Sequence, residues 1–195
     1  AEVRYASIRA LGEIRDERAI QALTEQLSYY GKGEGAWSAL DALARIGHPS
    51  SLPTFEARLT DKDPPIRRAA VEGIARAGSA ASVERFVNDV NQDESEMVRA
   101  AMTFALYKKG HATYLGRLID FADGNKLAPQ LQGYFIELGA QVIPPVVVRL
   151  QEPDADVRRN LVTILGAVGD ESTVAALTPF KEDRDRDVAT AATYA

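Results

Sequence analysis

Apolar residues recur along this chain at the spacing of one helical face, and the pattern repeats about every 31 residues. One position marks the start of each repeat: Val3, Gly35, Ile66, Val98, Leu127, Val157 and Val188, in steps of 29 to 32 residues. Apolar residues at the start and four, seven and eight positions later lie on one side of a helix. A regular period in this range predicts stacked supersecondary units.

The position eight residues after each start predicts the core of a first helix. It is always large and apolar: Leu11, Leu43, Ile74, Leu106, Phe135 and Leu165. The position before it is small in the first four repeats (Ala10, Ala42, Gly73 and Ala105), which lets a neighbouring backbone approach. We therefore expect the first helices to pack closely against one another.

A glycine follows the first helix in five of six repeats, where a left-handed residue commonly ends a helix. These glycines are Gly47, Gly78, Gly110, Gly139 and Gly169, and Arg15 takes the slot in the first repeat. A second amphipathic stretch then predicts a second helix over residues 19–27, 51–59, 82–90, 114–121, 142–150 and 173–180. Pro179 falls late in its stretch and should shorten or bend that helix.

Polar residues recur around the starts of the first helices. Asp63, Ser95, Asp154 and Asp185 stand three residues before a start, which is the expected N-cap position. Arginine follows the start at Arg4, Arg67, Arg99 and Arg158, too regularly for a single active site. We expect these arginines to bond to the turns and caps of adjacent repeats.

The pattern D-x-D-x-x-[VI]-R-x-x-A-x-x-A-L-G, clearest in residues 61–79 and 152–170, resembles the HEAT repeat, in particular the HEAT-like repeats of the phycobilisome lyase type. The resemblance implies an all-α fold, a right-handed α–α superhelix (solenoid) of two-helix repeats, whose second helices line the concave surface. We expect one domain over residues 1–195, with six repeats and the start of a seventh at 188, forming part of a longer chain. Ala36 and Ala128 depart from the pattern, since they replace its arginine.

Charge and composition narrow the possible functions. The net charge of -5 opposes nucleic-acid binding, and the absence of cysteine excludes disulfides, cysteine nucleophiles and thiolate metal sites. No apolar run approaches the roughly 20 residues that span a bilayer, so we expect no membrane insertion.

Candidate chemistry in the sequence is sparse. The stretch YYGKGEGAW (29–37) lacks the G-K-[ST] of a phosphate loop, although Tyr29, Tyr30 and Trp37 could form an aromatic contact site. The favoured alternative is packing of this loop against the next first helix. His48 and His111 lie two repeats apart, roughly 20 Å, too far to share a metal ion. We expect no catalytic residue, no metal site and no cofactor.

The outward positions of the second helices hold Arg58, Arg85, Arg117 and Arg149 in successive repeats. These four residues, the second-helix arginines, could form a basic stripe for a partner. The alternative is a solvated surface on which they pair with acids such as Glu56, Asp89 and Asp120.

The leading functional prediction is a non-catalytic scaffold that binds a protein or acidic peptide in the groove lined by the second helices. Two alternatives stay open. The resemblance implies a subunit or chaperone of a bilin (tetrapyrrole) lyase, and HEAT-like repair proteins suggest nucleic-acid binding, which the acidic charge opposes.

The helical phase predicts the effect of one substitution. Leu106→Ala should lower the free energy of unfolding by about 2–5 kcal/mol, because it removes a large side chain from the core of a central repeat. Urea unfolding of the purified chain measures this, and a loss below about 1 kcal/mol would place Leu106 outside the core.

Overall fold

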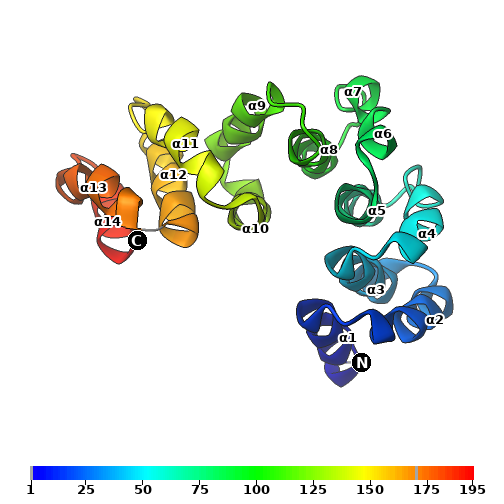
Figure 1. Ribbon diagram of the computed structural model, residues 1–195. Coiled ribbons are helices and arrows are strands. Elements are labelled where there is room, and N and C mark those ends of the chain that lie inside the picture. The colour runs from blue at the N-terminus through cyan, green and yellow to red at the C-terminus, as the bar shows by residue number, and fades with distance from the viewer. Residues whose placement is uncertain (1, 170) are drawn as a thin grey trace. The chain divides into compact units, whose positions relative to one another are not determined.

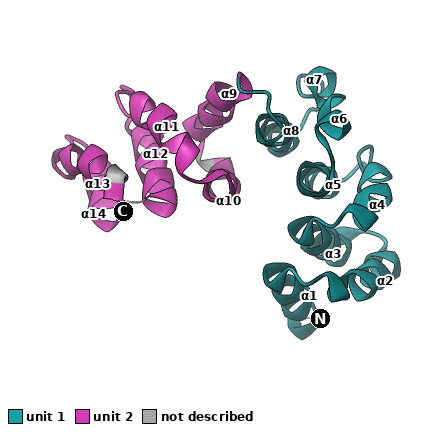
Figure 2. Cartoon of the chain, in the orientation of Figure 1, with its two compact units in different colours: residues 1–112 teal, residues 113–195 magenta. Residues whose placement is uncertain are grey.

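The computed structural model describes residues 2–169 and 171–195 and contains only helices and turns over those residues (Figure 1). The chain forms two compact units, residues 1–112 (unit 1) and residues 113–195 (unit 2), shown in Figure 2. The prediction of an all-α fold of stacked two-helix repeats is confirmed. The boundary between the units falls inside the repeat predicted to start at 98, between its two helices.

In unit 1, every predicted first helix is present, and the second helices of the second and third repeats are shorter than predicted. The first helices are α1 (Glu2–Ile14), α3 (Gly33–Ile46), α5 (Pro64–Ala77) and α8 (Glu96–Lys108). The second helices are α2 (Ile20–Tyr30), α4 (Leu52–Glu56) and the pair α6 (Ala80–Val83) and α7 (Phe86–Asp89); short 3-10 turns, η1 (Glu17–Ala19) and η2 (Pro49–Ser51), precede α2 and α4.

The predicted second helix over 51–59 stops early because its hydrogen bonds tighten. The amides of Arg58 and Leu59 bond three residues back, to the carbonyls of Phe55 and Glu56, in place of the four-residue spacing of an α-helix. Leu59 still reaches the core, where it is 8% exposed. The hydrophobic period therefore identified the buried residues correctly but overestimated the length of the helix.

The layering of unit 1 corrects the prediction that second helices line the concave surface. The helices α1, α3, α5 and α8 pack side by side, and α2, α4 and α7 each pack on the first helix of the following repeat. In Figure 1 the first helices follow the inner side of the curve of unit 1, and the second helices its outer side. The small residues at position seven explain this order, because they let the first helices approach most closely.

Unit 2 repeats the same two layers. Its first helices are α10 (Ala128–Leu138), α12 (Ala155–Val168) and α14 (Arg186–Tyr194), and its second helices are α9 (Tyr114–Asp120), α11 (Ile143–Arg149) and α13 (Glu171–Leu177). The 3-10 turns are η3 (Phe121–Asp123), η4 (Asn125–Leu127), η5 (Gly139–Val142) and η6 (Thr178–Glu182). Pro179 lies in η6, directly after α13 ends, as its position predicted.

The predicted core position is buried in every repeat but the first. Leu43, Leu106, Phe135 and Leu165 are 0% exposed and Ile74 is 1% exposed. Leu11 is only half-buried, and Val3 on the same helix is 82% exposed. The phase assigned to the first helices is therefore confirmed for α3, α5, α8, α10 and α12.

Glycine is required after the first helices for two different physical reasons. Gly47, Gly110 and Gly139 have φ angles of 65°, 108° and 73°, as the left-handed prediction requires. Gly78 has a φ of -86°, so the prediction is wrong there; a Cβ at this position would lie 2.8 Å from the Ile74 carbonyl oxygen. Gly169 has a φ of -61°, and a Cβ there would likewise collide with a carbonyl oxygen of the preceding helix, that of Leu165.

Two of the four recurring arginines join successive repeats through arginine–aspartate pairs, as predicted. In unit 1, Arg67 donates from Nε and Nη2 to the Asp93 carboxylate at 2.9 and 2.8 Å, and from Nη1 to the Asp61 carbonyl at 2.8 Å. In unit 2, Arg158 makes the equivalent bonds to the Asp183 carboxylate at 3.0 and 2.8 Å. Arg67 and Arg158 thus fasten their own repeats to the turn that begins the next one. Arg99 instead donates to the carbonyls of Asp93 and Glu94 in the turn before its own helix, and Arg4 donates to the Tyr30 hydroxyl at 3.5 Å.

All four predicted residues occupy the N-cap position of a first helix, but only two of them form the side-chain hydrogen bond that a cap supplies. Asp154 and Asp185 accept hydrogen bonds from the backbone of their helices. Asp63 and Ser95 occupy the N-cap without a side-chain cap bond. Their own amides instead donate to Asp61 and Asp93, two residues earlier, at 3.0 and 2.8 Å.

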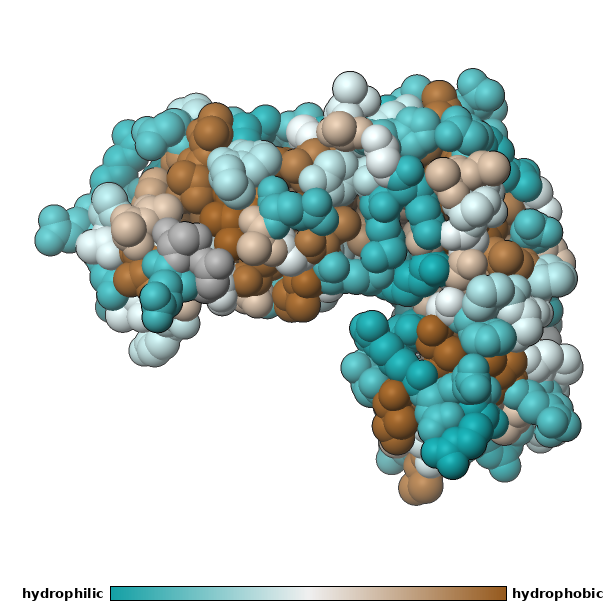
Figure 3. All heavy atoms as spheres, viewed as in Figure 1, coloured by the Kyte–Doolittle hydropathy of each residue, from teal (hydrophilic) through white to brown (hydrophobic). Residues whose placement is uncertain are grey.

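An apolar stretch in unit 2 corrects the expectation that no run approaches membrane-spanning length. Residues Ala128–Arg149 span 22 residues with a mean hydropathy of 1.2, and Figure 3 shows apolar side chains gathered over this part of unit 2. The stretch is two helices, since α10 ends at Gly139 with a φ of 73° and α11 starts four residues later. An 11-residue helix reaches only about 16 Å, half the thickness of a bilayer core.

Arg15 has a φ of 57° in the slot where other repeats carry glycine. Arg15→Gly should raise the free energy of unfolding by about 0.5–1 kcal/mol, because glycine adopts this conformation without steric cost. Urea unfolding measures the change. Arg9→Gly, in the exposed interior of α1, is the matched control and should be destabilising by about 1 kcal/mol; a destabilising Arg15→Gly would contradict the assignment of strain.

The Arg158–Asp183 pair predicts an acid-dependent stability for unit 2. The hydrogen bond from Arg158 lowers the pKa of Asp183, and the Asp185 amide adds to this against the opposing effect of burial. The unfolded chain then binds the proton more tightly, so the stabilisation is complete above about pH 4 and is lost as pH falls through the folded pKa.

Asp183→Asn should therefore cost about 1.5–3 kcal/mol at pH 7 and flatten the decline of stability below pH 4. Urea unfolding between pH 3 and 7 gives both quantities. Glu182→Gln, an exposed neighbour, should leave both unchanged. If the free energy of unfolding of Asp183→Asn falls below pH 4 as steeply as that of the unmodified protein, other carboxylates cause the fall.

Candidate functional site

Three of the second-helix arginines are engaged by nearby acids, from their own repeat or from the preceding one. Arg58 lies 3.4 Å from Asp61, and Arg85 lies 3.6 Å from Asp89. Arg149 contacts Asp120 at 2.7 Å and also pairs with Glu152. Arg117 is half-buried on α9. Asp89 and Asp120 were predicted partners, whereas Asp61 takes the place predicted for Glu56.

Exposure distinguishes these arginines from one another. The Arg85 side chain is 54% exposed, against 29% for Arg58 and 33% for Arg149. The Arg85–Asp89 distance of 3.6 Å exceeds a hydrogen bond, so Arg85 has the weakest recorded pairing of the three. In unit 1 both Arg58 and Arg85 belong to the outer layer.

The aromatic residues of the 29–37 stretch divide between two places. The Tyr29 and Tyr30 rings are 5.2 Å apart, and Tyr30 also lies 5.6 Å from Tyr5. A Cβ at Gly35 would collide with the Tyr30 ring, so this tyrosine packs on the next first helix, which is the alternative favoured by the sequence. Trp37 instead lies under the guanidinium of Arg68, whose Cζ is 5.5 Å from the centroid of the Trp37 ring.

The inner side of unit 1 carries a surface that the sequence analysis missed. It comprises positions two, six and ten after each start on the four first helices, which we term the inner face. Its residues are Tyr5, Arg9, Glu13, Trp37, Asp41, Arg45, Arg68, Glu72, Arg76, Ala100, Phe104 and Lys108. Glu72, Ala100 and Phe104 are only 5%, 0% and 0% exposed, so the other nine residues form its accessible surface. The signal was available, because these positions lie opposite the predicted core on the same helices.

Ion pairs run across the inner face from helix to helix. Arg45 on α3 bonds to Glu13 on α1 at 2.8 Å and to Asp41 at 2.8 Å. Arg68 on α5 bonds to Asp41 at 3.2 Å and lies 3.5 Å from Glu72, which is buried. The carboxylates therefore connect cations of adjacent first helices.

The inner face is net positive although the chain is acidic. It holds five basic and three acidic residues, in a chain with net charge -5. Arg45, Arg76 and Lys108 form a row in the last turns of α3, α5 and α8, where cations also favour the helix dipole. Arg76 and Lys108 both lie over the Phe104 ring, at 5.9 and 5.8 Å.

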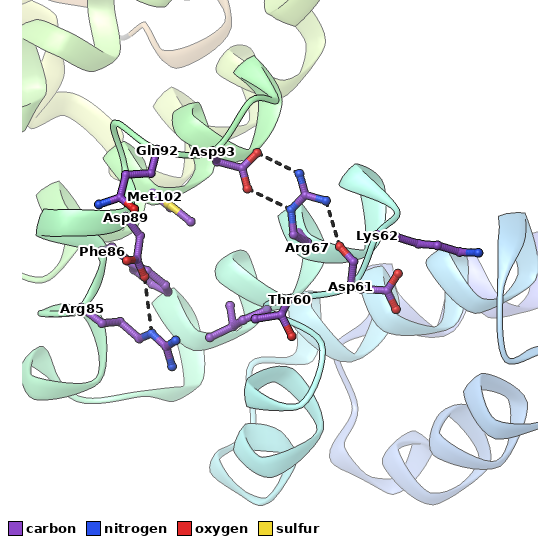
Figure 4. A pocket seen from close by; sticks show the side chains of 11 residues that line it. Thr60, Asp61, Lys62, Arg67, Arg85, Phe86, Asp89, Gln92, Asp93 and Met102 are labelled. Carbon is purple, nitrogen blue, oxygen red and sulfur yellow. Dashed lines mark hydrogen bonds and ion pairs between the residues drawn. The ribbon is translucent and has the colours of Figure 1, made fainter.

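A cleft of about 500 Å³ opens between the second and third repeats of unit 1 (Figure 4). One wall is the turn after α4 and the other is α7 with its following turn. The Arg67–Asp93 ion pair also lines the cleft. The lining residues are Leu59, Thr60, Asp61, Lys62, Arg67, Arg85, Phe86, Asp89, Gln92, Asp93 and Met102.

The histidines lie in separate polar contacts. His48 Nε2 lies 3.4 Å from Glu17, and His111 Nε2 lies 3.0 Å from Glu84, each pair linking two neighbouring repeats. Within residues 2–169 and 171–195, no three histidine or carboxylate side chains converge as metal ligands. Each histidine thus serves a contact between repeats.

Comparison with protein families decides the class of repeat. The family of HEAT repeats matches residues 33–107, and the PBS lyase HEAT-like repeat matches residues 3–29. The chain is a HEAT-repeat protein. Its first repeat is of the phycobilisome lyase type, as the resemblance of the sequence predicted.

Individual relatives of this HEAT-repeat protein are distant. The phycobilisome maturation protein of Synechococcus elongatus is 29% identical over 150 residues, covering 76% of this chain and 68% of that protein. Human deoxyhypusine hydroxylase is similar over 97% of this chain and 76% of that one, with 19% identity and a TM-score of 0.41. A designed armadillo repeat protein covers 97% of this chain and 90% of its own, with 17% identity and a TM-score of 0.37.

Proposed function

We propose that this HEAT-repeat protein is a non-catalytic protein-interaction scaffold whose partner, a protein or acidic peptide, binds the inner face of unit 1. The observation that carries the proposal is the net positive charge of this face in an acidic chain. A positive surface of this kind favours a negatively charged partner. The placement replaces the groove of second helices, which form the outer layer of unit 1.

The extent of the inner face supports a macromolecular partner. Packed helices lie about 8–10 Å apart, so four first helices extend over roughly 30 Å. A compact small molecule would contact one or two helices, whereas an extended acidic segment can contact all four. The Trp37 ring and the stem of Arg45 offer apolar area between the charges, which an extended peptide can cover.

The second-helix arginines are a second proposed location for the same partner. Arg58, Arg85 and Arg149 pair with acids, so an acidic partner would have to compete with Asp61, Asp89 and Asp120. Reversal of Arg85 and Arg117 to glutamate tests this location. Loss of the partner in that double variant, with the inner-face variant unaffected, would move the site to the outer layer.

A second candidate function is a subunit or chaperone of a bilin lyase. It is supported by the name of the relative from Synechococcus elongatus and by the PBS lyase HEAT-like repeat at residues 3–29. A bilin bound to the purified protein would give visible absorption and would favour this candidate. Nucleic-acid binding is the least favoured alternative, and a salt-sensitive shift with duplex DNA would support it.

The test of the scaffold proposal combines partner capture with charge removal on the inner face. The partner is first identified by affinity purification of the protein from its own cells. Calorimetric titration of that partner should then show about tenfold weaker binding to Arg45→Gln/Lys108→Gln, because two partly exposed cations of the row are removed.

The matched control is Arg18→Gln/Lys32→Gln, which removes the same charge from exposed positions outside the inner face. It should bind the partner as the unmodified protein does. Equal weakening by both double variants would indicate a general charge effect. Full affinity of the inner-face variant would contradict the proposed location.

A further inference from the structure

We infer that the cleft between the second and third repeats is a second, separate binding site, which takes an apolar side chain of a partner together with an adjacent carboxylate. The site lies in the outer layer of unit 1 and includes none of the inner-face residues. It therefore stands independently of the proposed function of that face.

The apolar part of the site is its floor. Leu59, Phe86 and Met102 line the cleft and are 8%, 0% and 5% exposed. The space of about 500 Å³ above them is open to solvent, so it suits one side chain of a bound partner and not an enclosed small molecule. A leucine-sized side chain entering the cleft would cover the remaining exposed area of this floor and gain its hydrophobic contact.

Two of the three carboxylates in the cleft are already engaged by the protein. Asp93 accepts from Arg67 with both oxygens and from the Ser95 amide, and its side chain is only 11% exposed. Asp61 accepts from the Asp63 amide and pairs with Arg58. These two acids therefore offer little negative charge to a ligand.

Arg85 supplies the positive group at the opening. Its guanidinium is separated by 3.6 Å from Asp89, and both side chains are about half exposed, so this pair is weak. In Figure 4 the Arg85 and Thr60 side chains reach the same rim from opposite walls, while Lys62 points away. A guanidinium and a hydroxyl together can donate to both oxygens of one carboxylate.

The remaining acid explains why a single carboxylate suits the site better than a polyanion. Asp89 is 41% exposed beside Arg85, and the whole chain carries a net charge of -5. A nucleic-acid backbone would meet repulsion from both. One acidic residue next to an apolar one can instead replace Asp89 as the partner of Arg85 while its neighbour contacts the floor.

The experiment uses the whole 195-residue chain and a fluorescent peptide of alternating leucine and glutamate, with a leucine–lysine peptide as the charge control. Fluorescence anisotropy should show binding of the acidic peptide alone. Arg85→Gln should weaken this binding by about two- to fivefold, and Asp89→Asn should strengthen it by a similar factor, as expected for half-exposed charges.

The opposite signs of the two substitutions separate recognition from a change in folding, which would affect both in the same direction. Both substitutions are compared in the Arg45→Gln/Lys108→Gln background, so that the acidic peptide does not report on the inner face, and Arg18→Gln, at an exposed arginine outside the cleft, should leave the affinity unchanged in that background. Unchanged affinity in Arg85→Gln, weaker binding in Asp89→Asn, or absence of peptide binding would each overturn the assignment. Competition by a short duplex DNA at equal strength would assign the cleft to phosphate.

Discussion

A bond between an arginine of one repeat and an aspartate at the start of the next fixes one junction between repeats in each unit. Asp93 receives the guanidinium of Arg67 and the amide of Ser95, so one carboxylate fixes the preceding helix and the beginning of the following one. Asp183 does the same with Arg158 and the Asp185 amide. Because these side chains are nearly buried, their charges are compensated by direct bonds and not by solvent.

The two layers of unit 1 differ in packing. The first helices pack directly against one another, and their outward side chains form a continuous set of ion pairs on the inner face. The second helices pack on the first helix of the next repeat, which leaves the cleft between α4 and α7 in the outer layer. Both candidate binding surfaces thus follow from the close approach of the first helices.

The sequence predicted the repeat period, the first helices and the joining arginines, because each depends on local periodicity. The sequence did not predict which layer of helices lies on the inner side of the curve of unit 1. The hydrophobic period shows which face of a helix is buried, but not which layer packs more tightly. Gly78 illustrates a second limit, since its lack of a side chain reflects the nearby Ile74 carbonyl and not its φ angle. Trp37 was grouped with Tyr29 by proximity along the chain, whereas the fold places it under Arg68.

The short helices α6 and α7 have a consequence for amide hydrogen exchange. The α6–α7 segment is held by turns with three-residue spacing, at the amides of Glu84, Val87 and Asn88, and much of its surface is exposed. Segments of this kind open by local fluctuation, whereas the buried α5 exchanges only when the packing around it is lost. One wall of the cleft therefore belongs to a weakly protected part of unit 1, and a bound partner would slow exchange there.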